Sequence, residues 1–373
     1  MKLVYCIAGT YNSGGMERVL ANKANYLVNV GYDISIITTE QRGQKSFFRF
    51  DNRIKFYDLG INYEENNNTS FWNKAIHYPS KQLRHKKMLS SLLKEIKADV
   101  VVSMFCNEAA FLPNIDDGSK KVLEIHFSRY KRLQYARKGL WRLADLIRSH
   151  NDLKIAERYD KFVVLTNEDM SYWGHLTNIC VIPNARSFTF DKPASLSGKD
   201  VIAIGRLNFQ KGYDRLIKAW HKVVLKVPDA RLSIYGDGDL TYEIQCLIND
   251  LNLNKSVSLR KAQSDIKEVY LNASLLVLSS HYEGLPMVLL EAQAAGLPIV
   301  SFACKCGPRD VVSDGNSGFL VENGDIEALA DRIIKVLNDN ELRAKMGAEA
   351  YANSLSFDES IIMQKWMDLF NSI

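Results

Sequence analysis

Residues 201–227 have the sequence VIAIGRLNFQKGYDRLIKAWHKVVLKV. The apolar, β-branched run Val201–Ile204 is typical of a buried strand, and Tyr213–Val227 is typical of an amphipathic helix. The loop between them contains two cations, Arg206 and Lys211. A strand, a short loop and a helix in this order predict a parallel sheet that is covered by helices.

The same alternation continues on both sides of this unit. Short apolar runs form two series of predicted strands, which are Leu3–Ala8, Ile34–Thr38, Val100–Met104, Val122–Ile125 and Phe162–Leu165, then Val201–Ile204, Arg231–Tyr235, Val257–Leu259, Leu275–Leu278 and Ile299–Phe302. Predicted helices lie between them, among them Glu17–Val30 and Met287–Ala295. We therefore predict an α/β protein with two doubly wound, Rossmann-like domains.

The length of 373 residues favours two domains. Proline, serine and glycine cluster between Asn184 and Lys199, which indicates the join. We predict a first domain over residues 1–185, a second over 186–355, and a C-terminal helix in 356–373 that could pack back on the first domain. In such a pair of domains, a ligand is expected in the cleft between the carboxyl ends of the two sets of strands.

The composition excludes several classes of protein. With 46% hydrophobic and 24% charged residues, the chain is expected to be a folded, soluble protein. The apolar run Leu3–Gly9 is followed at once by polar and glycine residues, so it is interpreted as a strand and not as a signal peptide. A cytoplasmic location is expected, and any membrane contact should be peripheral. No two of the six cysteines have the spacing of a zinc or redox motif, so no metal is assigned.

Charge is concentrated in the first half of the chain. Residues 1–185 carry 27 Lys and Arg against 19 Asp and Glu. Much of the excess lies in two helical stretches with interleaved aromatic residues, namely Lys74, Lys81, Arg84, Lys86, Lys87, Lys94 and Lys97 with Trp72, and Arg129, Lys131, Arg132, Arg137, Lys138, Arg142 and Arg148 with Tyr130, Tyr135 and Trp141. This pattern fits an anionic membrane surface, nucleic acid or a solvated face.

Gly14 and Gly15 lie in the turn between the first predicted strand and the first helix. Backbone amides at such a turn can receive a phosphate or sugar oxygen, although ordinary turn glycines also occur there. The spacing does not match G-x-G-x-x-G, so a dehydrogenase is disfavoured.

The cationic loop has a more specific chemistry. At the carboxyl end of a strand, Arg206 can bind a diphosphate through its guanidinium fork, and Lys211 can bind it as a point charge. The same two cations would stabilise the charge that develops on a nucleoside diphosphate as it leaves a sugar.

Residues 283–291 have the sequence EGLPMVLLE. Glu283 is expected in a loop, Gly284 allows close approach to a ligand, and Pro286 precedes free amides at a helix start. Glu291 follows on an otherwise apolar helix. A carboxylate there needs a partner, which ribose hydroxyls or a salt bridge would supply.

These features together resemble family 4 of the retaining glycosyltransferases, which have the GT-B fold. The resemblance rests on Gly14-Gly15, His126 after a strand, the loop Gly205–Gly212, Tyr235-Gly236-Asp237-Gly238, and Glu283 with Glu291. The sequence departs from the family pattern after the predicted strand Val257–Leu259, where Arg260 and Lys261 stand in place of the usual glycine.

The resemblance implies a role for each matching residue. Arg206 and Lys211 would bind the diphosphate, Glu283 the donor sugar and Glu291 the ribose. His126 would lie beside the transferred sugar, and Asn184 would be the interdomain hinge. Backbone amides around Gly284 to Val288 would contact the sugar or phosphates. The donor-binding residues implied for this segment are Gly284, Leu285, Pro286, Met287 and Val288, of which Pro286 has no N–H to donate.

The implied activity is a metal-independent, retaining transfer of a hexose or N-acetylhexosamine from a nucleotide-diphosphate sugar, with UDP preferred. The stretch Gly-Gly-Met-Glu-Arg-Val resembles the start of enzymes of capsule, O-antigen and other surface-polysaccharide assembly. The acceptor is therefore expected to be a glycan or a polyprenyl-linked glycan at the inner membrane face. Nucleic acid is not expected as a partner. A nucleotide-sugar epimerase and a non-catalytic nucleotide-sugar binder are the alternatives.

Overall fold

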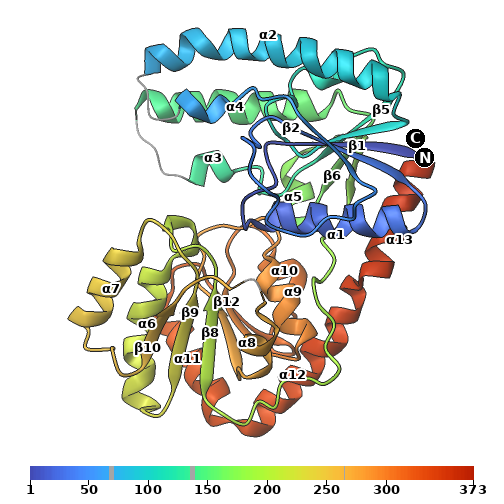
Figure 1. Cartoon of the computed structure of the whole chain (residues 1–373). Coiled ribbons are helices and arrows are strands. Elements are labelled where there is room, and N and C mark those ends of the chain that lie inside the picture. Colours follow the sequence, from blue (N-terminus) through green and yellow to red (C-terminus); the bar gives the residue numbers. More distant parts are fainter. Residues whose placement is uncertain (67–70, 135–138, 264) are drawn as a thin grey trace. The chain divides into compact units, whose positions relative to one another are not determined.

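The computed structural model describes residues 1–66, 71–134, 139–263 and 265–373 (Figure 1). From the basic stretches, Tyr135, Arg137 and Lys138 and the side chains of Trp72, Lys74, Arg132 and Trp141 lie outside this description. The chain divides into two compact units, each treated by itself. The first unit comprises Met1–Leu165, Tyr172–Ile182 and Ile362–Ile373, and the second comprises Thr166–Ser171 and Pro183–Ile361.

The first unit is built on a parallel sheet. Its strands, within the described residues, have the order β3-β2-β1-β4-β5-β6-β7. Their bounds are β1 Lys2–Ile7, β2 Asp33–Thr38, β3 Lys55–Asp58, β4 Val100–Ser103, β5 Lys120–Glu124, β6 Lys161–Val164 and β7 Ile179–Val181.

Helices connect these parallel strands. They are α1 Gly15–Asn29, α2 Phe71–Ile96, α3 Lys131–Gln134 and α4 Leu140–Ala156, with short 3-10 turns at Tyr63–Asn66 and Leu112–Asn114. Helix α1 buries the apolar stripe that its sequence predicts, including Leu20, Ala24 and Leu27. It also buries Lys23, which the pattern did not predict.

The second unit repeats the arrangement with the order β10-β9-β8-β11-β12-β13 among the described strands. All the strand pairs in this sheet are parallel as well. The bounds are β8 Asp200–Ile204, β9 Arg231–Tyr235, β10 Val257–Arg260, β11 Leu275–Leu278, β12 Ile299–Phe302 and β13 Gly318–Val321. The predicted class, with two Rossmann-like parallel-sheet domains, is confirmed.

The helices of the second unit and of the chain end are as follows: α5 Asn167–Tyr172, α6 Tyr213–Lys226, α7 Thr241–Asp250, α8 Lys267–Leu271, α9 Met287–Ala294, α10 Pro308–Val311, α11 Ile326–Asn338, α12 Asn340–Ser354 and α13 Glu359–Asn371, with 3-10 turns at Phe209–Lys211 and Leu355–Phe357. In the described part of the chain, no helix is both long enough and apolar enough for a bilayer crossing.

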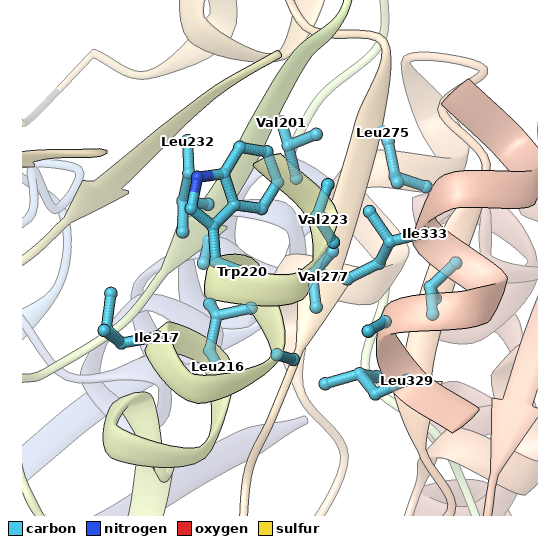
Figure 2. Close-up of a cluster of buried hydrophobic side chains, with 14 of the residues drawn as sticks. Val201, Leu216, Ile217, Trp220, Val223, Leu232, Leu275, Val277, Leu329 and Ile333 are labelled. Carbon is cyan, nitrogen blue, oxygen red and sulfur yellow. The ribbon is translucent and has the colours of Figure 1, made fainter. Parts of the chain in front are cut away.

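The core of the second unit explains why residues 201–227 are so informative. Leu216, Trp220 and Val223 recur at helical spacing on α6 and are fully buried. Figure 2 shows the Trp220 ring beside the strand residues of this core, with side chains of α11 close to α6. Burying one such side chain contributes roughly 1.5–3 kcal/mol, so this stripe fixes α6 on the sheet.

Three strands were absent from the prediction, and each has a physical reason. Strand β3 is mostly exposed and lies at an edge of its sheet, so it lacks an apolar pattern. Strand β7 has three half-buried residues. Strand β13 begins with Gly318, where a Cβ atom would lie 2.1 Å from the carbonyl oxygen of Ile299. Glycine is therefore required at a position where propensity argues against a strand.

Candidate functional site

The loops at the carboxyl ends of β8 and β9 pack backbone against backbone. A Cβ atom on Gly236 would lie 1.9 Å from the carbonyl oxygen of Gly205, and one on Gly238 would lie 2.3 Å from that of Leu207. The amide of Leu207 donates to the carbonyl of Asp237 at 3.0 Å. The glycines of the predicted motifs therefore allow two loops to approach each other at one sheet edge.

The loop after β11 joins the same cluster. Ser279 Oγ donates to the carbonyl of Lys211 at 2.9 Å. Gly212 has φ +59°, and a Cβ atom there would lie 2.4 Å from the carbonyl oxygen of Ser279. The loop after β12 contacts the loop after β11, because the amide of Glu283 donates to the carbonyl of Lys305 at 2.8 Å. Four strand ends therefore contribute to one surface of the second unit.

Lys211 and Glu283, which were predicted separately, are brought together in this cluster. Lys211 Nζ lies 2.7 Å from Glu283 Oε1, and the two side chains are 17% and 6% exposed. Ser280 Oγ donates to the same oxygen at 2.6 Å, and Gln210 Nε2 donates to Oε2 at 3.3 Å. Burial, with the negative charge of Glu283 added, raises the pKa of Tyr213 well above its usual range, so this hydroxyl stays protonated.

Arg206 lies in the same loop, five residues before Lys211, with its side chain exposed to solvent. Its carbonyl accepts a hydrogen bond from the amide of Asn208 at 2.8 Å, which tightens the turn. Arg206 is therefore accessible to a ligand, while Lys211 is held by a carboxylate.

The segment after Glu283 leads into α9 as predicted. Pro286 occupies the N-cap position, and the helix begins at Met287. Leu285 and Pro286 are buried, whereas Gly284, Met287 and Val288 are partly exposed. Amides in the first turn of a helix have no intrahelical acceptor, so those near this partly exposed surface can bind a ligand oxygen.

Glu291 has a protein partner. Its carboxylate is 3% exposed and accepts a hydrogen bond from the hydroxyl of Tyr270 at 2.6 Å. The sequence predicts ribose hydroxyls or a salt bridge as the partner of this carboxylate. Tyr270 was missed because it lies 21 residues away on α8, and no local pattern connects the two.

Two predicted site regions belong to the first unit. Gly14 caps α1 with φ −77° and without a side-chain hydrogen bond, and α1 begins at Gly15. His126 follows β5 by two residues, and its side chain is 6% exposed. Its Nε2 atom lies 3.0 Å from Oε1 of Glu124, a residue that the sequence reasoning had not singled out.

The described residues contain no cluster of side chains that could ligate a metal ion. In residues 1–66, 71–134, 139–263 and 265–373, no group of three or more His, Cys, Asp or Glu side chains is arranged to hold a metal ion. Metal independence stays a prediction.

Comparisons with known proteins agree with this geometry. Residues 186–353 match the family model described as "Glycosyl transferases group 1". The chain is 29% identical over 373 residues to an uncharacterized glycosyltransferase of Haemophilus influenzae, with 98% of each chain covered. It is also 29% identical over 390 residues to a Campylobacter jejuni protein named GalNAc-alpha-(1->4)-GalNAc-alpha-(1->3)-diNAcBac-PP-undecaprenol alpha-1,4-N-acetyl-D-galactosaminyltransferase, covering 100% of this chain and 99% of the relative.

Solved structures show the same architecture. A mutant of the S. aureus protein TarM, in complex with Fondaparinux, alpha-GlcNAc-glycerol and UDP, superposes with a TM-score of 0.82 at 19% identity, covering 99% of both chains. At this identity the likeness concerns the fold alone. Residues 186–353 therefore match the group 1 glycosyltransferase family, in a chain whose two units have the parallel-sheet fold of GT-B glycosyltransferases.

Proposed function

We propose that the chain is a retaining glycosyltransferase that transfers a hexose or N-acetylhexosamine from a UDP-sugar to a glycan or lipid-linked glycan in surface-polysaccharide assembly. The observation that carries the proposal is the Lys211–Glu283 pair, at 2.7 Å, on a surface where four strand ends meet. It combines a cation for a diphosphate with a carboxylate for sugar hydroxyls. The relative named for an undecaprenol-linked substrate and the UDP-bound structural neighbour support the acceptor and donor classes.

In this proposal, the loop after β8 stabilises the leaving group. The bond between the anomeric carbon and the phosphate oxygen breaks, and negative charge develops on UDP. Arg206 and Lys211 neutralise that charge, which lowers the barrier because they are already in place. A bond forms between the acceptor oxygen and the anomeric carbon on the same face, and the departing phosphate takes the acceptor proton.

Glu283 serves as a hydroxyl acceptor in this scheme and not as a nucleophile. A carboxylate nucleophile must be free to attack the anomeric carbon. Here the carboxylate already accepts from Lys211, Ser280 and Gln210. These three donors fix its orientation, so it can hold a sugar hydroxyl in one geometry.

Glu291 and its neighbour Tyr270 would complete the donor site at the ribose, and the first amides of α9 would contact the sugar or phosphates. The site uses no metal in this proposal. EDTA should leave turnover unchanged within about twofold. Turnover that EDTA abolishes and Mg²⁺ or Mn²⁺ restores would disprove metal independence, without bearing on the donor.

The deciding experiment is a donor panel. A nucleotide sugar that binds the folded state at 100 times its Kd raises the free energy of unfolding by about 2.7 kcal/mol, so a thermal-shift screen identifies the donor. Proton NMR of the freshly formed product then reports the anomeric configuration. An inverted anomer would disprove retention, and a screen in which only non-UDP donors stabilise the protein would disprove the donor class.

The same assays separate the alternatives. An epimerase converts the donor without an acceptor, and a non-catalytic binder leaves it intact. The family match to glycosyltransferases favours neither.

We also propose that α4 contacts an anionic bilayer. The burial pattern of this helix is the opposite of that of a core helix. Asp145 and Asp152 are buried, while Leu143, Leu146 and Ile147 are 55%, 45% and 54% exposed. Arg142 and Arg148 of the same helix are exposed. Exposed apolar residues between cations are the pattern of an interfacial helix.

Vesicle cosedimentation tests the membrane contact. The wild type should sediment with vesicles of anionic lipid, less so at high salt, and a triple substitution of Leu143, Leu146 and Ile147 by Gln should stay in solution. Equal sedimentation of both proteins would exclude α4 as the contact.

A further inference from the structure

A buried ion pair lies next to His126 in the first unit. Lys23, on α1, donates from Nζ to both carboxylate oxygens of Glu124, at 2.5 and 2.7 Å. The two side chains are 3% and 1% exposed. The pair therefore connects a helix to the last residue of β5, two residues before His126.

This ion pair is a poor source of stability. Removing each charge from water costs several kcal/mol, and the attraction between the two recovers that cost only in part. Burial raises the pKa of Glu124, but the positive charge of Lys23 and the contact with His126 outweigh it and bring the pKa to about 2. Burial lowers the pKa of Lys23, and Glu124 opposes that shift. The contact of Lys23 Nζ with both oxygens of Glu124 inside the first unit therefore calls for an explanation other than stability.

The carboxylate also contacts the imidazole. Glu124 Oε1 lies 3.0 Å from Nε2 of His126, although the ring N–H is not aligned for a straight hydrogen bond. With Nε2 directed to the carboxylate, Nδ1 is the ring atom left for another partner.

The C-terminal helix covers the other side of the pair. Lys23 Nζ lies 3.6 Å from the centroid of the Trp366 ring on α13, and that side chain is 2% exposed. The face of an indole ring stabilises a cation. Trp366 therefore shields Lys23 from water, favours its charged form and limits the positions that the amine can take.

We propose that Glu124, fixed by Lys23, is a positioning residue for His126. The negative charge of Glu124, 3.0 Å from Nε2, favours the imidazole tautomer and orientation that place the ring proton on Nε2. Nδ1 can then accept a hydrogen bond from a hydroxyl of the transferred sugar. The part that concerns the sugar rests on the proposed function, whereas the part that concerns the imidazole does not.

The test uses two variants and a matched control. Glu124→Gln removes the charge and keeps the shape. The double variant Lys23→Met with Glu124→Gln removes both charges, so no unpaired charge is left in the core and folding is retained. The control is Asp117→Asn, which neutralises another buried carboxylate of the first unit, one that is paired with Lys121.

The first readout is the tautomer of His126, measured by long-range ¹H–¹⁵N NMR with His126→Gln for assignment. The wild type and Asp117→Asn should carry the proton on Nε2, and both Glu124 variants should shift toward Nδ1 or a mixture. An unchanged His126 signal in the double variant would overturn the proposal.

The second readout is kinetic. The double variant should lose at least about tenfold in kcat, with a smaller change in donor KM, because the imidazole no longer presents a fixed acceptor. A wild-type kcat alongside a shifted tautomer would overturn the link to the sugar. A shifted tautomer in a protein that transfers no sugar would disprove the proposed function and leave the positioning of His126 standing.

Discussion

Lys211 Nζ lies 2.7 Å from Oε1 of Glu283, so the cation predicted to bind a diphosphate is paired with a carboxylate of the protein. A nucleoside diphosphate must compete with this carboxylate or share the ammonium with it. Sharing is feasible because an ammonium has three donors and Glu283 occupies one. The pair would then link phosphate and sugar recognition, since movement of Lys211 toward the phosphate also changes the environment of Glu283.

Lys211→Met should lower kcat/KM for the donor by about 10²–10³, which corresponds to roughly 3–4 kcal/mol of transition-state stabilisation. Initial rates with the donor from the panel measure it. Lys218→Met is the matched control, because Lys218 is an exposed lysine of α6 that pairs with Asp214. If Lys211→Met kept kcat/KM within twofold of the wild type, Lys211 would not contact the diphosphate.

Arg206→Ala should lower kcat more than it weakens donor binding, because the guanidinium acts on charge that develops only as the bond breaks. The free energy of unfolding should change by less than about 0.5 kcal/mol, since the side chain is exposed. Calorimetric donor affinity and kcat are compared with those of Lys226→Ala, an exposed cation in the last turn of α6. A weaker affinity with an unchanged kcat would mean that Arg206 only attracts the donor.

The fold, and the residues of the candidate site that follow the predicted strands, were predictable from short sequence patterns. Strand, loop and helix repeat with enough regularity that the sequence predicts Arg206 and Lys211 at the carboxyl end of a strand and Glu283 in a loop before a helix. Ser280 follows β11 and carried the same signal, although it was not singled out. Gly236 and Gly238 were noted as a motif, and their reason is the close approach of Gly205 and Leu207.

The remaining contacts depend on residues that are distant in sequence. Lys23 interrupts an apolar helix stripe and is expected to be exposed there, but its partner Glu124 is 101 residues away. A pattern within one helix carries no information about such a partner. The same holds for Tyr270 and Glu291, so the buried polar contacts are what the sequence left unpredicted.

Tyr270→Phe should destabilise the protein by about 1–3 kcal/mol, because Glu291 loses a donor in a site from which water is excluded. Donor affinity should fall as well if Glu291 holds the ribose, since the carboxylate is then less well oriented. Urea unfolding and donor titration measure the two effects. Tyr242→Phe is the control, a tyrosine of α7 that is 78% exposed. A loss of stability with unchanged donor affinity would separate Glu291 from the ribose.

Glu108 should make stability depend on pH. It is 1% exposed, accepts a hydrogen bond from Ser103 Oγ at 2.6 Å, and burial raises its pKa to about 7. Its pKa in the unfolded chain is about 4.3. Between these values the folded state holds a proton that the unfolded state has lost, so the free energy of unfolding falls as pH rises and levels off above pH 7.

Glu108→Gln removes this effect, because the amide stays neutral at every pH and its oxygen can still accept from Ser103. Between pH 5 and pH 8 the wild type should lose about 2–3 kcal/mol more than the variant. His85, whose pKa burial lowers to about 4, adds a loss of stability toward acid pH, but it is present in both proteins and cancels in the difference. Urea unfolding at the two pH values measures the effect, with the exposed Glu95→Gln on α2 as control. Parallel pH profiles for wild type and Glu108→Gln would show that Glu108 is ionised in the folded protein, and its burial would then require a cation that the described contacts do not include.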